Sequence, residues 1–155
     1  MSLEQKVIHK LIAKRKTLAL AESCTGGLLA SRLTDVPGSS KCLKFCLVAY
    51  TNETKTKFLR VPASTIKKFG AVSEPTAIAM ANGAQKQLKS NIGLSITGIA
   101  GPTGGTKRKP VGLVYIAINH NNETFCSKYF FKGGRGMIKQ HTVKQALALL
   151  LKLLV

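Results

Sequence analysis

Three glycine-containing turns, each placed after a short apolar stretch, constrain the fold of this chain more than any other feature. The turns span residues 23–27, 98–105 and 133–136. The apolar stretches before them have the composition of buried strands, and the first and third turns lead into helical patterns. Open α/β sheets bind their ligands in loops at strand ends. The pattern therefore predicts an α/β fold whose candidate binding loops follow its strands.

Apolar periodicity along the chain predicts strands and helices that alternate. Helices are expected over 3–15, 28–33, 52–59, 63–69, 74–88 and 137–154, and strands over 17–21, 45–50, 92–97, 111–118 and 124–131. The last two strands are joined by a turn-rich segment typical of a hairpin, which requires an antiparallel pair. No repeat, linker or low-complexity tract interrupts the series. We expect one α/β domain over 1–155, with a mixed sheet flanked by helices on both faces.

The charge of the chain is strongly unbalanced. Its 155 residues include 24 Lys and Arg against 6 Asp and Glu, a formal net charge of +18. A hydrophobic content of 45% supports a packed core and argues against a disordered basic tail. The charge predicts attraction to an anion, whether nucleic acid, anionic lipid or a phosphorylated small molecule. No known nucleic-acid-binding motif is visible, so only nonspecific attraction to nucleic acid is predicted.

The cysteines and the hydropathy pattern indicate the compartment. The four cysteines form no CxxC pair, and the first sixteen residues are too highly charged for a signal peptide. The longest apolar run, 146–155, is too short to cross a bilayer and contains Lys152. We expect a cytoplasmic protein with reduced thiols and no membrane segment. The ligand pairs that zinc sites favour are missing, so no metal site is predicted.

Several hydroxyl side chains in loops are candidate nucleophiles. They are Ser23, Thr25, Ser39 and Ser40. A serine needs a base to become nucleophilic, and the three histidines lie on helices or in a turn, away from these loops. Tyr50 and Lys55 lie where a strand ends and a helix begins, so both can face one pocket. A lysine acts as a base only if its pKa is depressed. By spacing alone, Tyr50 can equally be a core residue and Lys55 a solvated one.

Six motifs follow one another along the chain. They are AESCTGG (21–27), PGSS (37–40), VAYTNETK (48–55), GAVSE (70–74), TGIAGPTGG (97–105) and KPVG (109–112). Taken together they resemble the CinA C-terminal domain family, whose characterised members are nicotinamide-nucleotide amidases. The resemblance extends from residue 3 to residue 154. The resemblance is to the stand-alone form of the amidase, so the further domain of longer family members is not expected.

The resemblance implies hydrolysis of the carboxamide of nicotinamide mononucleotide (NMN) to nicotinic acid mononucleotide and ammonia, without a cofactor. By matching position, Ser40 is the expected nucleophile, and Ser23 is the alternative. Tyr50 and Lys55 would transfer protons. The substrate itself would be bound by Glu22, Thr25, Gly26, Gly27, Ser39, Gly98, Gly101, Gly104, Gly105 and Arg135.

The chain departs from the family pattern at five positions. These are Leu43, Cys46, Thr51, Gly134 and Lys139, which stand where phenylalanine, glycine, serine, aspartate and arginine are common. The first three positions are expected to alter packing only. The last two flank Arg135 and bear on how firmly that side chain is held.

Two other functions are compatible with the sequence. One is a competence- or damage-related module that binds nucleic acid or a nucleotide without catalysis. The other is the same fold with its catalytic activity lost. The closing helix is apolar nearly all round, and family members are commonly oligomeric, so a homo-oligomer is expected.

Overall fold

The five strands form one mixed sheet in the order β2-β1-β3-β4-β5. The computed structural model describes all residues, 1–155. Three strands are parallel, β1 (Leu18–Glu22), β2 (Leu43–Val48) and β3 (Ile92–Gly98), and two are antiparallel to β3 and to each other, β4 (Leu113–His120) and β5 (Glu123–Phe130). The hairpin predicted from the turn-rich segment is therefore present as β4–β5.

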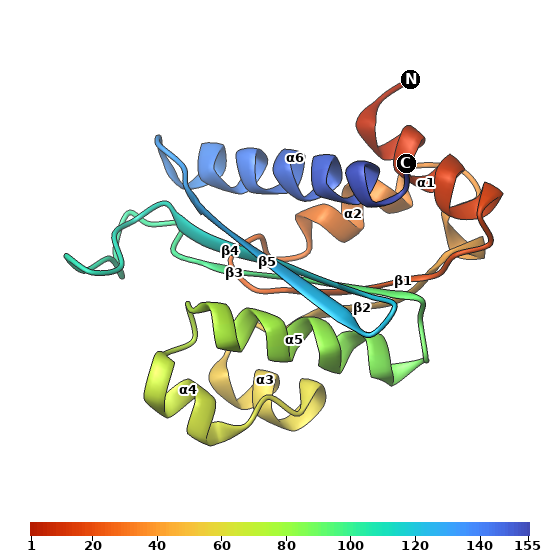
Figure 1. Ribbon diagram of the computed structural model, residues 1–155. Helices are drawn as coiled ribbons and strands as arrows, with labels where there is room; N and C mark the ends of the chain where they lie inside the picture. The colour runs from red at the N-terminus through yellow and green to blue at the C-terminus, as the bar shows by residue number, and fades with distance from the viewer.

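Helices cover both faces of the sheet (Figure 1). On one face lie α1 (Leu3–Ala13), α2 (Leu28–Thr34) and α6 (Arg135–Leu153), and on the other lie α3 (Asn52–Leu59), α4 (Ala63–Phe69) and α5 (Glu74–Gln87). A short 3-10 helix, η1 (Ser39–Lys41), precedes β2. The predicted α/β domain with a mixed sheet between two helical layers is confirmed. None of the helices is both long and apolar enough to cross a membrane.

The two faces of the sheet differ in the size of their side chains. Toward α1, α2 and α6 the strands present large residues such as Leu20, Leu94 and Ile116, which form the main core. Toward α5 they present alanines and Gly93, which faces the Ala81 carbonyl of α5 so closely that a Cβ there would collide. Small residues thus let α5 lie directly on the sheet, and the closing helix α6 is buried along one side by the main core.

Several predicted boundaries are displaced by one or two residues. Strand β2 starts at Leu43, earlier than predicted, because Leu43 pairs with Leu18 across the parallel ladder. Glu22, predicted to lie in a turn, is the last residue of β1. Helix α6 begins at Arg135 instead of residue 137. The boundaries depend on partners across the sheet, which periodicity along one strand does not include.

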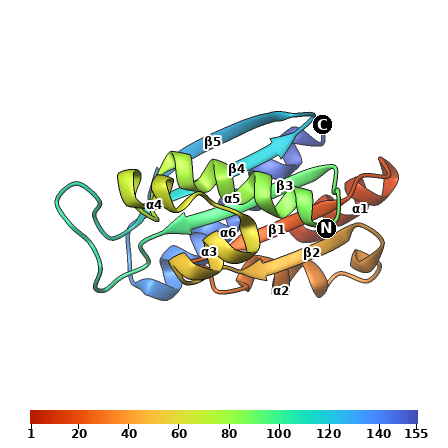
Figure 2. The ribbon, with the colours of Figure 1, turned by 90° about the horizontal axis from the view of Figure 1, so that it is seen from below.

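The directions of the strands bring distant loops to one edge of the sheet. The arrows of β2 and β3 point the same way in Figure 2, and β4 points the opposite way. The segments that follow β1, β2 and β3 therefore leave from the same edge, where β4 begins and β5 ends. Helix α6 starts close after β5. This edge consequently gathers all three glycine-containing turns singled out in the sequence.

Helix α6 starts without a side-chain cap. Its N-cap is Gly134, in an extended conformation (φ −74°, ψ 172°), and its first turn has no acidic residue. A Cβ at position 134 would meet no atom within 4 Å. The aspartate common here in the family would therefore fit, accept a hydrogen bond from the first turn and favour the helix dipole.

Gly134→Asp is expected to raise the free energy of unfolding by about 0.5 kcal/mol, which corresponds to an increase in Tm of roughly 1–2 °C. Thermal unfolding followed by circular dichroism measures this shift. Gly134→Asn is the matched control, since it supplies the cap without the charge and should give a smaller increase. A lower Tm in both variants would contradict the assignment of Gly134 as an unfilled cap.

Candidate active site

A cavity of about 320 Å³ lies at the edge of the sheet where the parallel strands end. Its walls come from five segments that are far apart in the chain. These are the turn after β1, the segment from the end of β2 into α3, the connection between α4 and α5, the end of β3 with the loop after it, and the start of α6, represented by Ser23, Lys55, Ala71, Gly101 and Arg135. A crevice outside the carboxyl ends of parallel strands is the usual ligand site of open α/β sheets.

Ser23 and Lys55 meet in this cavity. The Lys55 ammonium donates hydrogen bonds to the Ser23 hydroxyl (Nζ–Oγ, 3.2 Å) and to the Ala49 carbonyl (2.8 Å). Lys55 is only 1% exposed and Ser23 8% exposed. Burial lowers the pKa of Lys55, because the charged amine loses its hydration, while the Cys24 thiol acts weakly in the opposite direction. This pair is a hydroxyl beside an amine that is easier to deprotonate than an ordinary lysine.

The cap of helix α3 sets the position of Lys55. Thr51 is the N-cap, and its hydroxyl accepts a hydrogen bond from the Thr54 N–H (3.1 Å). Lys55 follows in the first turn of this helix, close after β2, and so returns toward the edge of the sheet. Threonine replaces the serine common at position 51 and retains the capping function, as expected for a hydroxyl side chain.

Arg135 links three walls of the cavity. Its guanidinium donates one hydrogen bond to the Gly101 carbonyl (2.6 Å) and one to the Tyr50 hydroxyl (2.9 Å). Tyr50 is 57% exposed, so it stands at the mouth of the cavity and not in the core. Because Arg135 donates to Tyr50, the Tyr50 hydroxyl keeps its own proton for another acceptor. The structure thus brings Tyr50, Lys55, Ser23 and Arg135 together.

The turn after Ser23 leaves backbone donors available. The Ser23 N–H donates to Ile96 and the Gly26 N–H donates to the Ser23 carbonyl (both 3.0 Å). The N–H groups of Cys24 and Thr25 have no acceptor within the chain. An N–H next to a nucleophile in a strand–turn–helix arrangement is a suitable donor for an oxyanion.

Glu22 and Thr25 were expected to bind substrate, and the structure places them differently. The Glu22 carboxylate is buried and accepts three hydrogen bonds, from the Thr25 hydroxyl (2.6 Å) and from the N–H groups of Leu29 (3.0 Å) and Ala30 (2.9 Å). It therefore satisfies the first turn of α2, a helix whose own N-cap is a glycine. With their polar groups engaged in this way, both side chains hold the turn and do not line the cavity.

Ser39 and Ser40 lie at the end of the sheet where β2 begins, whereas Lys55 lies at the end where β2 finishes. Both belong to η1, before β2 begins, whereas Lys55 comes after β2 ends. The six residues of β2 extend about 20 Å, at roughly 3.3 Å per residue. The two serines instead line a separate hollow beside Cys46. The structure therefore does not bring Ser40 together with Tyr50 and Lys55, as the expected role as nucleophile requires.

The predicted glycines divide into two groups. Gly98, Gly101 and Gly104 line the cavity, whereas Gly26, Gly27 and Gly105 do not. The backbone at Gly98 lies close to two side chains, because a Cβ there would stand 2.7 Å from Val114 and 3.1 Å from the Cys24 sulfur. The glycines of the turn after Ser23 have positive φ, +60° at Gly26 and +96° at Gly27, which favours glycine. Their role is to shape the turn that presents Ser23.

Eight residues that line the cavity were not among the predicted site residues: Cys24, Asn52, Ala71, Val72, Thr97, Ile99, Ala100 and Thr103. Asn52 and the pair Ala71 and Val72 stand on its walls, and Thr97 holds the latter segment through a hydrogen bond from its hydroxyl to the Ala71 carbonyl (2.8 Å). Asn52 lies inside the VAYTNETK motif, so its neighbours Tyr50 and Lys55 gave a signal. Ala71 and Val72 lie inside the GAVSE motif, but neither carries a chemical group that points to a site, and the tertiary structure places them on this wall.

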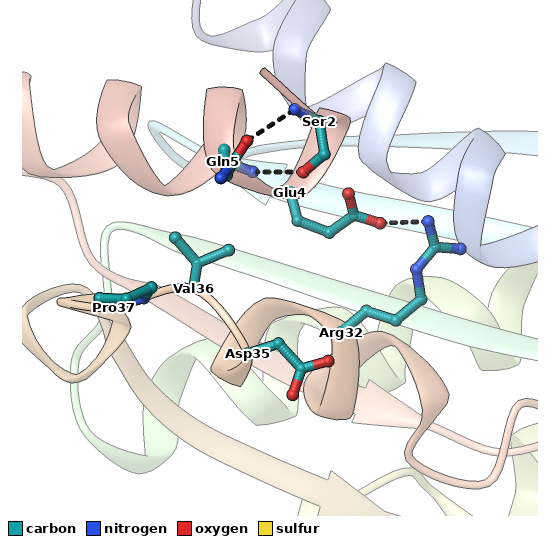
Figure 3. Close-up of a pocket in the computed structure, with 7 residues that line it drawn as sticks. All are labelled: Ser2, Glu4, Gln5, Arg32, Asp35, Val36 and Pro37. Atoms are coloured by element: carbon teal, nitrogen blue, oxygen red, sulfur yellow. Dashed lines mark hydrogen bonds and ion pairs between the residues drawn. The ribbon is translucent and has the colours of Figure 1, made fainter.

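A second hollow, of about 260 Å³, lies between α1 and the end of α2 (Figure 3). Arg32 forms an ion pair there with Glu4, as Figure 3 shows, and Asp35 also lines the hollow. No group of three or more His, Cys, Asp or Glu residues is arranged to hold a metal ion anywhere in the chain.

Comparison with known proteins places this architecture in a family. The model of the CinA C-terminal domain matches residues 1–154. A competence-damage inducible protein of Clostridioides difficile (strain 630) is 50% identical over 146 residues, which are 94% of this chain and 35% of that protein. The chain thus spans about a third of the length of the curated relatives it matches.

Solved structures agree with this comparison over nearly the whole of both chains. A CinA superfamily protein from Klebsiella pneumoniae superposes with a TM-score of 0.95 at 32% identity, covering 98% of this chain and 95% of the other. A competence/damage-inducible protein from Agrobacterium tumefaciens superposes with a TM-score of 0.90 at 38% identity, covering 99% and 96%. The chain therefore belongs to the CinA C-terminal domain family.

Proposed function

We propose that this protein is a nicotinamide-nucleotide amidase that converts NMN and water to nicotinic acid mononucleotide and ammonia. The observation that carries the proposal is the buried Lys55 amine 3.2 Å from the Ser23 hydroxyl, at the edge of a cavity with cationic walls. A serine beside a base of lowered pKa is the arrangement that acyl transfer requires. The resemblance to a family that includes NMN amidases supports the same substrate class.

The first half of the reaction forms an ester on Ser23. Neutral Lys55 takes the Ser23 proton while Oγ attacks the carboxamide carbon, and the carbonyl oxygen becomes an oxyanion. The Cys24 N–H, which belongs to a residue of the cavity wall, is suitable to bind this oxyanion. The Lys55 ammonium then returns the proton to the departing nitrogen, the C–N bond breaks, and ammonia leaves.

The second half releases the acid. A water molecule occupies the position of ammonia, gives a proton to Lys55 and attacks the ester carbon. The new tetrahedral intermediate collapses, the ester bond to Ser23 breaks, and the proton on Lys55 restores the serine hydroxyl. Tyr50, whose hydroxyl is held by Arg135 at the mouth of the cavity, is placed to assist proton transfer to the leaving group.

The test of the proposal is ammonia release measured with three amides: NMN, nicotinamide and glutamine. We expect release from NMN, with much lower kcat/KM for nicotinamide, which lacks the ribose and phosphate that supply binding energy away from the carboxamide. Glutamine tests for a general amidase. Protein that folds normally and releases no ammonia from NMN would contradict the proposal.

The proposed base predicts a pH dependence. Lys55 acts only when neutral, so activity should rise with pH through the pKa of Lys55 and level off above it. Because burial lowers this pKa, the rise should be centred below 10.5, the usual value for a lysine. The measurement is kcat at saturating NMN against pH. An activity that rises only above pH 10.5, or does not change with pH, would contradict Lys55 as the base.

A further inference from the structure

Lys139 is a cation beside the candidate site that has no partner within the chain. It lies in the second turn of α6 and is half-buried. The only ion pair in the molecule is Arg32–Glu4, and no hydrogen bond is formed by the Lys139 amine. A half-buried ammonium has lost part of its hydration, and all three of its N–H donors remain available to a ligand.

The Lys139 amine lies over the turn that carries Ser23. Its Nζ is 3.6 Å from the position that a Cβ of Gly26 would occupy. Gly26 in turn is joined to Ser23 by the N–H to carbonyl hydrogen bond of 3.0 Å, and a turn closed in this way keeps its first and fourth Cα atoms within about 7 Å. The Lys139 amine therefore lies against the same turn that presents the Ser23 hydroxyl.

The electrostatics of Cys24 support this position. Burial raises the pKa of the Cys24 thiol to about 12, and the positive charges of Lys139 and Lys55 oppose this rise. Both amines thus act on the same sulfur, from α6 and from α3. Cys24 and Lys55 line the cavity, whereas Lys139 lies outside its lining residues, against the turn beside Cys24.

The cationic side chains that line the cavity already form hydrogen bonds within the protein, whereas the Lys139 amine forms none. Arg135 stands one turn earlier on the same helix, but its guanidinium already holds Tyr50 and the Gly101 carbonyl. Lys55 is bound to Ser23 and Ala49. The Glu22 carboxylate, next to Ser23 in the chain, accepts three hydrogen bonds from the start of α2 and the Thr25 hydroxyl and forms no ion pair.

We propose that Lys139 binds the phosphate of the nucleotide substrate and sets the preference for a nucleotide over the corresponding nucleoside. This inference rests on the proposed function. Lysine binds phosphate as a compact point charge, without the fixed geometry that a guanidinium needs. A phosphate held on α6 orients the ribose and directs the carboxamide toward Ser23. Such an interaction exists before and during the reaction, so its loss raises KM and leaves kcat nearly unchanged.

The kinetic experiment compares wild-type protein, Lys139→Met and Lys144→Met with NMN and with nicotinamide riboside, which lacks the phosphate. Lys144 is exposed on the same helix and outside the site, so its replacement controls for loss of one charge. We expect Lys139→Met to raise KM for NMN roughly tenfold, to leave kcat within about twofold and not to alter the low activity on the riboside. Lys139→Arg should restore the KM for NMN.

A binding experiment separates this inference from the proposed function. The probe is ribose 5-phosphate, which contains no carboxamide, and the measurement is the increase in Tm that it causes. The increase should occur in wild type and Lys144→Met and be lost in Lys139→Met, even if NMN proves not to be a substrate. Equal increases in wild type and Lys139→Met, or equal losses of activity on NMN and the riboside, would overturn the inference.

Discussion

Ser23→Ala protein is expected to release no measurable ammonia from NMN, with kcat reduced on the order of 10⁴-fold or more, while Ser40→Ala protein remains as active as wild type. Ser23 is the hydroxyl that contacts the Lys55 amine, and removing a nucleophile abolishes the route through the ester. Ser40 lies at the other edge of the sheet, about the length of β2 away. The assay is ammonia release at saturating NMN.

The two variants distinguish the two candidate nucleophiles. If Ser40 were the nucleophile, Ser40→Ala would be the inactive protein and Ser23→Ala would keep activity. Ser23→Ala removes one side-chain oxygen from a turn whose backbone hydrogen bonds remain, so its Tm should stay close to that of wild type. Circular dichroism and Tm establish that both variants are folded. An inactive Ser40→Ala protein together with an active Ser23→Ala protein would reject Ser23 as the nucleophile and the mechanism built on it.

The second large effect is expected from Lys55→Met. Loss of the general base should lower kcat by about 10²–10⁴-fold, with little change in KM, because Lys55 contacts the nucleophile and not the remote parts of the substrate. Methionine has similar length and no charge, so it can fill the buried space that the lysine stem occupies. Ammonia release and NMN binding, measured separately, test the two parts of this expectation.

Lys55→Met should also have a larger free energy of unfolding than wild type at pH values below the folded-state pKa of Lys55. The pKa of Lys55 is lower in the folded than in the unfolded protein, so the unfolded state binds the proton more tightly between the two pKa values. The stability of wild type therefore falls as pH decreases from 10.5 through the folded pKa, and the full cost remains at lower pH. Lys55→Met lacks this cost.

Unfolding by urea at pH 7 and near pH 10.5 measures this difference. The free energy of unfolding of Lys55→Met should exceed that of wild type by a larger amount at pH 7 than near pH 10.5. Lys57→Met, on the same helix at an exposed position, is the control and should show no such pH dependence. A Lys55→Met protein that keeps wild-type activity would exclude Lys55 as the base, whatever its stability.

Much of the fold follows from local patterns. The apolar residues of α1 recur at helical spacing, and Ser73 before Pro75 marks the start of α5, where the structure has an N-cap that accepts from the Thr76 N–H. These signals depend on residues a few positions apart, which is the range over which side chains and backbone determine secondary structure. The order of strands in the sheet has no such local signal.

The candidate site shows the same division. Ser23, Tyr50 and Lys55 each lie where a strand ends and a turn or helix begins, so the sequence was sufficient to nominate them. It could not separate Ser23 from Ser40, because both are loop serines next to strands. Ser23 follows its strand and Ser40 precedes its strand, and this difference matters only once β1 and β2 are known to be parallel.

Glu22 illustrates the limit for a charged residue. In the sequence it stands beside the nucleophile in a glycine-rich motif, which favours a role in binding. In the structure its carboxylate turns away from the cavity, because the unpaired N–H groups at the start of α2 are the nearest strong donors. The direction of a side chain depends on donors that the fold supplies.

By itself, then, the sequence determined an α/β domain, a set of glycine-containing turns at strand ends and the residue types of a serine–lysine site. These follow from periodicity and from the conformational range of glycine, which act over short stretches of chain. Only the tertiary structure decided which serine meets the lysine, that Arg135 holds the cavity walls together and that Lys139 is left without a partner. Parallel strands have their carboxyl ends together at one end of the sheet and their amino ends at the other. Contact between loop residues therefore depends on how distant strands pair.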